Sequence, residues 1–187
     1  LPNFIEKIAN AGCEVFIIHA RKAFLKGLSP AQNREIPPLN YDLVEEMKVR
    51  WPKLKIILNG GLETLDEVRQ RLSKLDGVML GRAAYKTPWV LSIVDNLIYG
   101  EPEKNKTRED VIDMMVNYAA TQKSLGVPVK SITRHMLGLF HAEPGAKAWR
   151  KFLAEEARGL DAEPEIIRHA YFAVCEAASF KTQGEAA

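Results

Sequence analysis

The sequence predicts a mixed fold, α/β plus all-α: the C-terminal portion of a (β/α)8 TIM barrel followed by a small helical bundle. Residues 1–100 alternate between short apolar runs typical of strands and periodic patterns typical of helices, whereas residues 107–187 show helical patterns alone. Such alternation produces parallel strands joined by right-handed crossovers. Three strands in an open sheet would leave both edges unpaired, which favours part of a closed barrel over the alternative, a doubly wound sheet.

Strands are expected at three apolar runs, because strands buried on both faces show continuous rather than alternating apolar residues. The runs cover residues 15–18, 56–58 and 78–80. Helical spacing of apolar residues lies between them. Thr64 and Glu67 form the S/T-x-x-E capping box expected at the start of one of these helices.

Helical patterns continue to the end of the chain. Thr87-Pro88 predicts a helix start after the third strand, and the polar residues 100–106 are the expected linker. Thr107 is expected to cap the first helix of the second domain. The four helices predicted there, which would form a small bundle, cover about residues 107–126, 131–140, 146–157 and 164–180.

The composition excludes several protein classes. The chain has 187 residues, of which 47% are hydrophobic and 27% charged, as in ordinary globular proteins. No apolar run approaches the roughly 20 residues that span a bilayer, so we expect no membrane segment. Cys13 and Cys175 lie far apart and lack metal-ligand spacing. We expect them to be buried thiols in the reducing cytoplasm, and we expect no metal site.

Two glycine-containing corners follow consecutive predicted strands: Asn59-Gly60-Gly61 and Gly81-Arg82. In a barrel, the carboxyl ends of the strands form the active-site face, and the last two loops commonly bind phosphate. Glycine lets the backbone approach an anion closely, and arginine adds a forked, charged donor. The alternative is that these glycines only form tight turns. Their repetition with an adjacent arginine favours phosphate binding.

The loop after the first strand, residues 19–41, is unusually long, and long loops in compact domains tend to be functional. It begins at His19-Ala20-Arg21 and carries further cations and one acid, Glu35. His19 alone is compatible with an ordinary structural histidine. The excess of cations, which includes Arg21 and Arg34, favours an anionic substrate.

Residues 123–151 contain six basic side chains and one acidic side chain. Lys130 and Arg134 are four residues apart and would share a helix face. Lys147, Arg150 and Lys151 would form a second basic stripe. Stripes of this kind bind the phosphates of a folded RNA, although a solvated helix surface is the common alternative. Trp149 is expected in the core.

Longer motifs then resemble a known family. The strings HARKAFLKGLSPAQNREIPPL, LNGGL, GVMLGRAAYKTPW and SITRHMLGLFHAEPGAKAWRKFL are similar to those of the tRNA-dihydrouridine synthases, in particular the A-type enzymes that act on D-loop uridines. The resemblance extends from Phe16 to Phe152 at least. It implies an FMN-binding TIM barrel with a C-terminal helical tRNA-binding domain, active as a monomer.

The resemblance also implies roles for single residues. His19 matches a flavin-contacting histidine, Asn59, Gly60 and Gly61 match one phosphate loop, and Gly81 and Arg82 match the second. The tRNA contacts implied by the resemblance lie at Arg21, Asn33 and Arg34 in the loop and at Lys147 and Arg150 in the helical part. Lys130, Arg134 and Lys151 join this set through the basic stripes.

The implied reaction is reduction of uridine to 5,6-dihydrouridine in tRNA, with FMN as cofactor and NADPH as reductant. The resemblance implies that the catalytic cysteine lies in the first half of the barrel, so it is expected upstream of Leu1. Cys13 precedes a strand and Cys175 lies in the last helix, so neither matches that position. The chain is therefore expected to be the C-terminal half of the enzyme and inactive alone. Two alternatives remain open: a phosphate-binding barrel isomerase or lyase, and a non-catalytic RNA-binding fragment.

Overall fold

The computed structural model describes residues 1–159 and 161–184, with side chains described as far as residue 179. The chain divides into two compact units, Leu1–Ala83 and Ala84–Ala187. The division therefore falls before the expected linker at residues 100–106. Within the described residues, no helix is long and apolar enough to cross a membrane.

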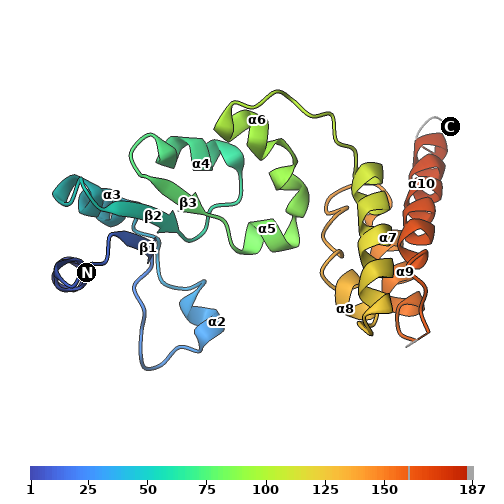
Figure 1. The fold of residues 1–187 in the computed structure, drawn as a ribbon, viewed down its shortest axis with the longest axis horizontal. Coiled ribbons are helices and arrows are strands. Elements are labelled where there is room, and N and C mark those ends of the chain that lie inside the picture. Colours follow the sequence, from blue (N-terminus) through green and yellow to red (C-terminus); the bar gives the residue numbers. More distant parts are fainter. Residues whose placement is uncertain (160, 185–187) are drawn as a thin grey trace. The chain divides into compact units, whose positions relative to one another are not determined.

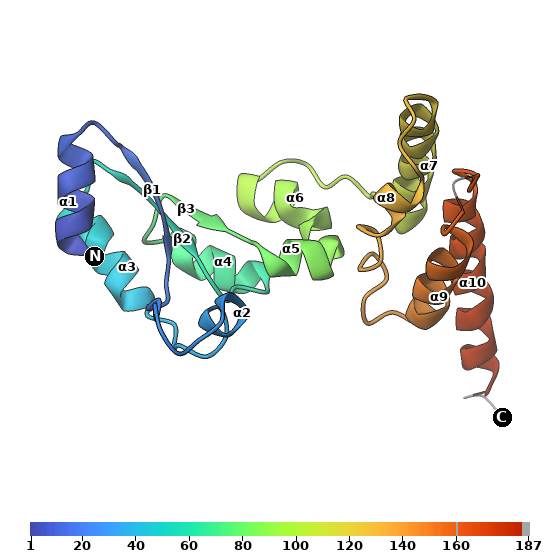
Figure 2. The same cartoon turned by 90° about the horizontal axis from the view of Figure 1, so that it is seen from below.

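The first unit contains a parallel sheet of three strands in the order β1-β2-β3 (Figures 1 and 2). The strands are β1 (Val15–His19), β2 (Lys55–Asn59) and β3 (Gly77–Met79). In the register, His19 lies beside Asn59, and Asn59 beside Met79. The three predicted strands and their parallel pairing are confirmed, and the carboxyl ends of all three meet at one edge.

Helices connect and cover these strands. They are α1 (Pro2–Asn10), α2 (Pro30–Asn33), α3 (Tyr41–Arg50), α4 (Leu65–Leu72) and α5 (Arg82–Lys86), which continues into the second unit. The predicted capping box at α4 is confirmed: the Glu67 amide donates to the Thr64 hydroxyl, and the Thr64 amide donates to the Glu67 carboxylate. The long loop is not structureless, because it contains α2.

Burial of the sheet differs from the prediction. Ile56 and Leu58 on β2 are fully buried, but β1 is buried on one face only. Val15 and Ile17 on its other face are 54% and 58% exposed. No described element covers that face, so the expectation of strands buried on both faces is wrong for β1. It is also wrong for β3, which has no buried residue and whose Met79 is 44% exposed. The core of this unit consists of Ile5, Phe16, Ile18, Ala20, Val44, Met47, Ile56, Leu58, Leu62 and Leu75.

The second unit is helical among its described residues. Its elements are the 3-10 helix η1 (Pro88–Ile93), α6 (Val94–Tyr99), α7 (Arg108–Ser124), α8 (Lys130–Thr133), α9 (Ala146–Glu156) and α10 (Ile166–Gly184). Thr107 caps α7 through a capping box with Asp110, as expected for Thr107. The helix predicted at residues 131–140 is wrong beyond Thr133, because turns follow α8 and Gly138 packs against the backbone of Lys86 too closely for a Cβ atom.

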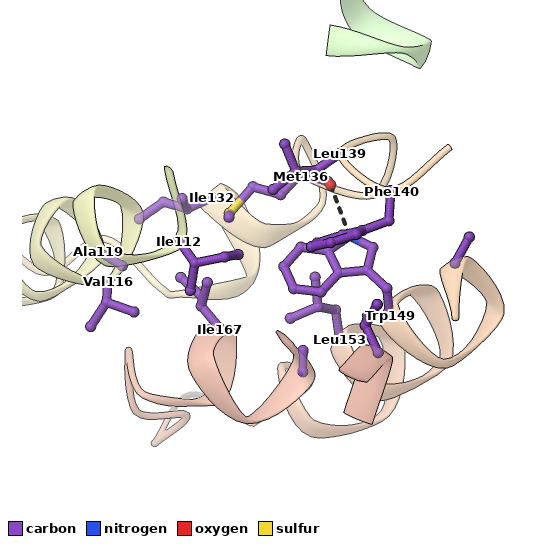
Figure 3. Close-up of a cluster of buried hydrophobic side chains, with 13 residues drawn as sticks. Ile112, Val116, Ala119, Ile132, Met136, Leu139, Phe140, Trp149, Leu153 and Ile167 are labelled. Carbon is purple, nitrogen blue, oxygen red and sulfur yellow. Dashed lines mark hydrogen bonds between the residues drawn. The ribbon is translucent and has the colours of Figure 1, made fainter. Parts of the chain in front are cut away.

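One apolar core joins α7, α8, α9 and α10 (Figure 3). Trp149 is 0% exposed and lies in its centre, where Nε1 donates a hydrogen bond of 3.0 Å to the carbonyl oxygen of Met136. Trp149 is therefore a core residue, as predicted. The buried set consists of Ile112, Val116, Ala119, Ile132, Met136, Leu139, Phe140, Ala146, Trp149, Leu153, Ile167, Ala170 and Val174.

The two thiols are not buried, which corrects the prediction. Cys13 is partly exposed in the turn between α1 and β1, and its Sγ donates to the carbonyl oxygen of Val15 at 3.4 Å. Cys175 is exposed on α10. The helical spacing of Ala170 and Val174 turns that side of α10 to the core, so the adjacent position 175 lies outside it.

Candidate functional site

The carboxyl edge of the sheet brings both glycine corners together. His19, Asn59 and Met79 end the three strands there, and the following residues close around a pocket of about 170 Å³. A sheet edge formed by parallel strands is where this architecture binds ligands. The pocket is lined by His19, Arg34, Asn59, Gly60, Gly61, Leu62, Glu63, Met79, Gly81, Arg82 and Ala83.

The first corner requires glycine at both positions. Gly60 has φ = 120° and Gly61 has φ = 71°, which side-chain-bearing residues rarely adopt. A Cβ at Gly61 would also clash with the Leu39 side chain. Tyr41 Oη donates to the carbonyl oxygen of Gly60 at 2.8 Å and fixes the corner. Among the described contacts, the amides of Gly60 and Gly61 donate to no acceptor, so they are suited to an anion.

The second corner is less constrained. A Cβ at Gly81 would meet nothing within 4 Å, so the backbone there is open to a ligand. The Arg82 guanidinium already has a partner: Nη1 lies 2.9 Å from Glu35 Oε1. The side chains of this pair are 47% and 67% exposed, and exposed pairs contribute only about 0–1 kcal/mol. An anion can therefore replace Glu35 at Arg82 at little cost.

The pKa of the His19 ring depends on the charges in this pocket. Partial desolvation of its ring, followed by the positive charges of Arg21 and Arg82, lowers the pKa of His19 below its ordinary value. A bound phosphate has the opposite sign and would raise that pKa. Because binding then favours the protonated ring, phosphate affinity should rise as the pH falls through the pKa of His19.

We expect Glu35→Gln to increase the affinity for inorganic phosphate by about two- to fivefold, because Arg82 no longer has a competing carboxylate. The measurement is an NMR titration of the His19 ring with and without phosphate. Glu63→Gln is the matched control, since Glu63 lines the same pocket but has no ion pair among the described residues. A pKa of His19 that phosphate leaves unchanged would contradict the site.

The predicted tRNA residues of the loop do not all face solvent. Arg21 Nη1 donates to the carbonyl oxygens of Glu35 and Pro37. The Asn33 side chain accepts from the Phe24 amide at 2.8 Å and donates back to the Phe24 carbonyl at 2.9 Å. Both therefore shape the loop, whereas Arg34 is exposed and lines the pocket.

The five cations predicted for the helical part are all exposed, but they fall into separate groups. Arg134 and Arg150 line one pocket. Lys147 and Lys151 line another beside Glu143. Lys130 lines neither. None of the five has a carboxylate partner among the described ion pairs.

Several site residues had weak sequence signals. Tyr41 and Leu39 shape the glycine corner through contacts that only the fold creates. Glu35 was visible as the single acid in a basic loop, but its pairing with Arg82, 47 positions away, was not. Among the described residues, no group of three His, Cys, Asp or Glu side chains could hold a metal.

Comparison with known proteins identifies the family. The sequence model of the family described as dihydrouridine synthase (Dus) matches residues 1–172. The chain belongs to the dihydrouridine synthase family. The resemblance to dihydrouridine synthases stated from the sequence motifs is thereby confirmed, and the parallel sheet is consistent with part of the TIM barrel of that family.

Three curated relatives in the dihydrouridine synthase family carry the name tRNA-dihydrouridine(20/20a) synthase. The protein of Shewanella oneidensis is 46% identical over 93% of this chain and 52% of its own length. Those of Escherichia coli (strain K12) and Synechocystis are 44% and 42% identical over 91% of this chain and 50% and 51% of their own lengths. The chain thus spans about half the length of the curated relatives it matches.

Proposed function

We propose that this chain forms the phosphate-binding and tRNA-binding part of an FMN-dependent oxidoreductase that reduces uridine to 5,6-dihydrouridine in the D-loop of tRNA with NADPH. The observation that carries the proposal is the convergence of Asn59-Gly60-Gly61 and Gly81-Arg82 on one pocket in a dihydrouridine synthase chain. We further propose that the complete enzyme is a cytoplasmic monomer.

The pocket fits the phosphate end of FMN. The unpaired amides of Gly60 and Gly61 and the guanidinium of Arg82 supply donors, and the bare backbone at Gly81 permits close approach. His19, at the same edge, would contact the flavin. When bound, FMN supplies hydride transfer from NADPH to the uridine ring. The pocket of about 170 Å³ is smaller than a whole cofactor site, which supports a site completed by further residues.

The unpaired side of β1 also supports a site that further residues complete. β1 pairs with β2 on one side only among the described strands, and its exposed Val15 and Ile17 form an unpartnered apolar face. We propose that additional strands pair with β1 to complete a barrel, and that they supply the catalytic cysteine. Cys13 and Cys175 do not line the glycine pocket.

We propose that the helical unit binds the tRNA through its exposed cations Lys130, Arg134, Lys147, Arg150 and Lys151. In the loop, Arg34 would contact RNA directly, whereas Arg21 and Asn33 would hold the loop in the conformation that presents it. Cations without carboxylate partners are suited to phosphates, and their contribution weakens as salt rises.

A chimera tests this proposal. The matching segment of the Escherichia coli relative is replaced by residues 1–172 of this chain, and dihydrouridine is measured in unmodified tRNA with NADPH. We expect the purified chimera to be yellow with flavin and active, and the 187-residue chain supplied with FMN and NADPH to be inactive. A folded chimera without flavin would contradict the cofactor assignment. A flavin-loaded chimera that leaves uridine unreduced would contradict the reaction.

A further inference from the structure

The helical unit contains the pocket that Arg134 and Arg150 line. Its volume is about 350 Å³, and basic or hydrogen-bonding side chains surround it without any carboxylate. Only two of the lining residues, Arg134 and Arg150, belong to the cations predicted to bind RNA. The lining consists of Tyr85, Lys86, Arg134, His135, Leu137, Gly138, His141 and Arg150.

The wall of this pocket is held by the core. In the turn after α8, Met136 is buried in the core, whereas Arg134 and His135 are exposed. Trp149 ties this turn to α9 through its bond to Met136, which places the neighbouring Arg150 at the pocket. Gly138 packs against the backbone of Lys86 so closely that a Cβ would clash.

A polar chain lies along the wall. Arg134 Nε donates to His135 Nε2 at 2.9 Å, and His135 Nδ1 lies 2.9 Å from Tyr85 Oη. Because arginine only donates, Nε2 must accept and Nδ1 carries the proton, which it donates to Tyr85. This assignment follows from the hydrogen-bond network. It leaves the hydroxyl proton of Tyr85 for an external acceptor.

The charge of the pocket is uncompensated. Lys86, Arg134 and Arg150 have no carboxylate partner among the described ion pairs, although other cations of the unit do. Arg108 pairs with Glu143, for example, at 2.7 Å. A cluster of cations and one hydroxyl donor, open to solvent, matches the oxygens of a single phosphate group.

We propose that this pocket binds one phosphodiester of the RNA backbone, with Arg150, Arg134 and Lys86 as its charged donors and Tyr85 as its neutral donor. His135 is a positioning residue that orients Tyr85. Tyr85 is 56% exposed, so its ring can stack on the adjoining base. This inference rests on the proposed function, because it assumes that the chain's substrate is tRNA.

The test measures tRNA binding by the 187-residue chain as a function of salt. We expect Arg150→Gln to weaken binding roughly tenfold and to reduce the slope of log K against log[salt] by about 1. Tyr85→Phe should weaken binding roughly threefold, because it removes one donor and keeps the ring. The matched control is Arg69→Gln, an exposed arginine of α4 that lines none of the described pockets. It should change neither quantity.

A second measurement tests the phosphodiester site independently of tRNA binding by the chain. Uridylyl-uridine and inorganic phosphate are added separately while the ring signals of His135 and His141 are followed by NMR. A response to the dinucleotide that Arg150→Gln abolishes supports the pocket, even if the wild-type chain fails to retain tRNA, which would count against the proposed function alone. A response to inorganic phosphate only, or a tRNA salt slope that Arg150→Gln leaves unchanged, contradicts the proposed phosphodiester site. Neither result contradicts tRNA binding by the chain.

Discussion

Trp149→Ala is expected to lower the free energy of unfolding of the helical unit by about 3–5 kcal/mol. Trp149 is 0% exposed, and its ring packs against Phe140 with centroids 4.9 Å apart. The substitution leaves a cavity at the centre of the core and leaves the buried carbonyl of Met136 without its donor (Figure 3). The measurement is urea unfolding followed by far-ultraviolet circular dichroism, which does not depend on the tryptophan removed.

Two control variants test how much of the loss comes from the hydrogen bond to Met136 and whether Trp149 is the centre of the core. Trp149→Phe retains most of the ring and removes the bond to Met136, so it should cost about 1–3 kcal/mol, the penalty for an unsatisfied buried group. Trp89→Ala removes a tryptophan that is only partly buried against the same core and stacks on Arg108 at 4.4 Å. A loss for Trp149→Ala no larger than that for Trp89→Ala would mean that Trp149 is not the centre of this core.

The packing of Trp149 also affects the proposed RNA-binding pocket. Trp149 precedes Arg150 in α9, and its bond to Met136 fixes the turn that carries Arg134 and His135. Trp149→Ala should therefore weaken RNA binding without removing any charge. Loss of core packing and loss of a phosphate donor can be told apart, because only Trp149→Ala should also lower the free energy of unfolding.

Local sequence signals predicted the features of the fold that depend on residues close together in the sequence. The capping boxes at Thr64 and Thr107 formed because each requires only the residue three positions onward. The parallel sheet followed from the order of strands and helices. The turn after Thr133 could not be predicted in this way, because it depends on the contact of Gly138 with Lys86, 52 positions earlier.

The residues of the candidate site differ in the same way: some could be predicted from the sequence and others could not. Gly60 and Gly61 were identifiable because their role requires a missing side chain, and the fold gave both of them positive φ. The roles of Arg21 and Asn33 were not, since a basic or amide side chain in a loop is equally compatible with solvent, RNA or the loop's own carbonyls. Only the geometry reveals that both bind carbonyl oxygens within the loop.

The other large effect is expected at Gly81. In the chimera described above, Gly81→Ala should lower the affinity for FMN by about tenfold or more, because a methyl group would occupy the space through which the phosphate approaches the backbone. The protein itself should tolerate the change. The φ of Gly81 is not in the left-handed region, and an added Cβ would meet nothing within 4 Å. Flavin fluorescence gives the affinity, and thermal unfolding gives the stability.

Comparison with two other glycines makes the cause of this loss visible. Gly61→Ala should lower both stability and FMN affinity, because Gly61 has φ = 71° and its Cβ would clash with Leu39. Gly159→Ala, where the nearest atom to a Cβ would be 3.8 Å away, should change neither. Only a ligand that closely approaches Gly81 can make Gly81→Ala lose affinity while the protein keeps its stability. If Gly81→Ala binds FMN as tightly as Gly159→Ala does, then the phosphate does not lie against this corner, and the amides of Gly60 and Gly61 would have to hold it without Gly81.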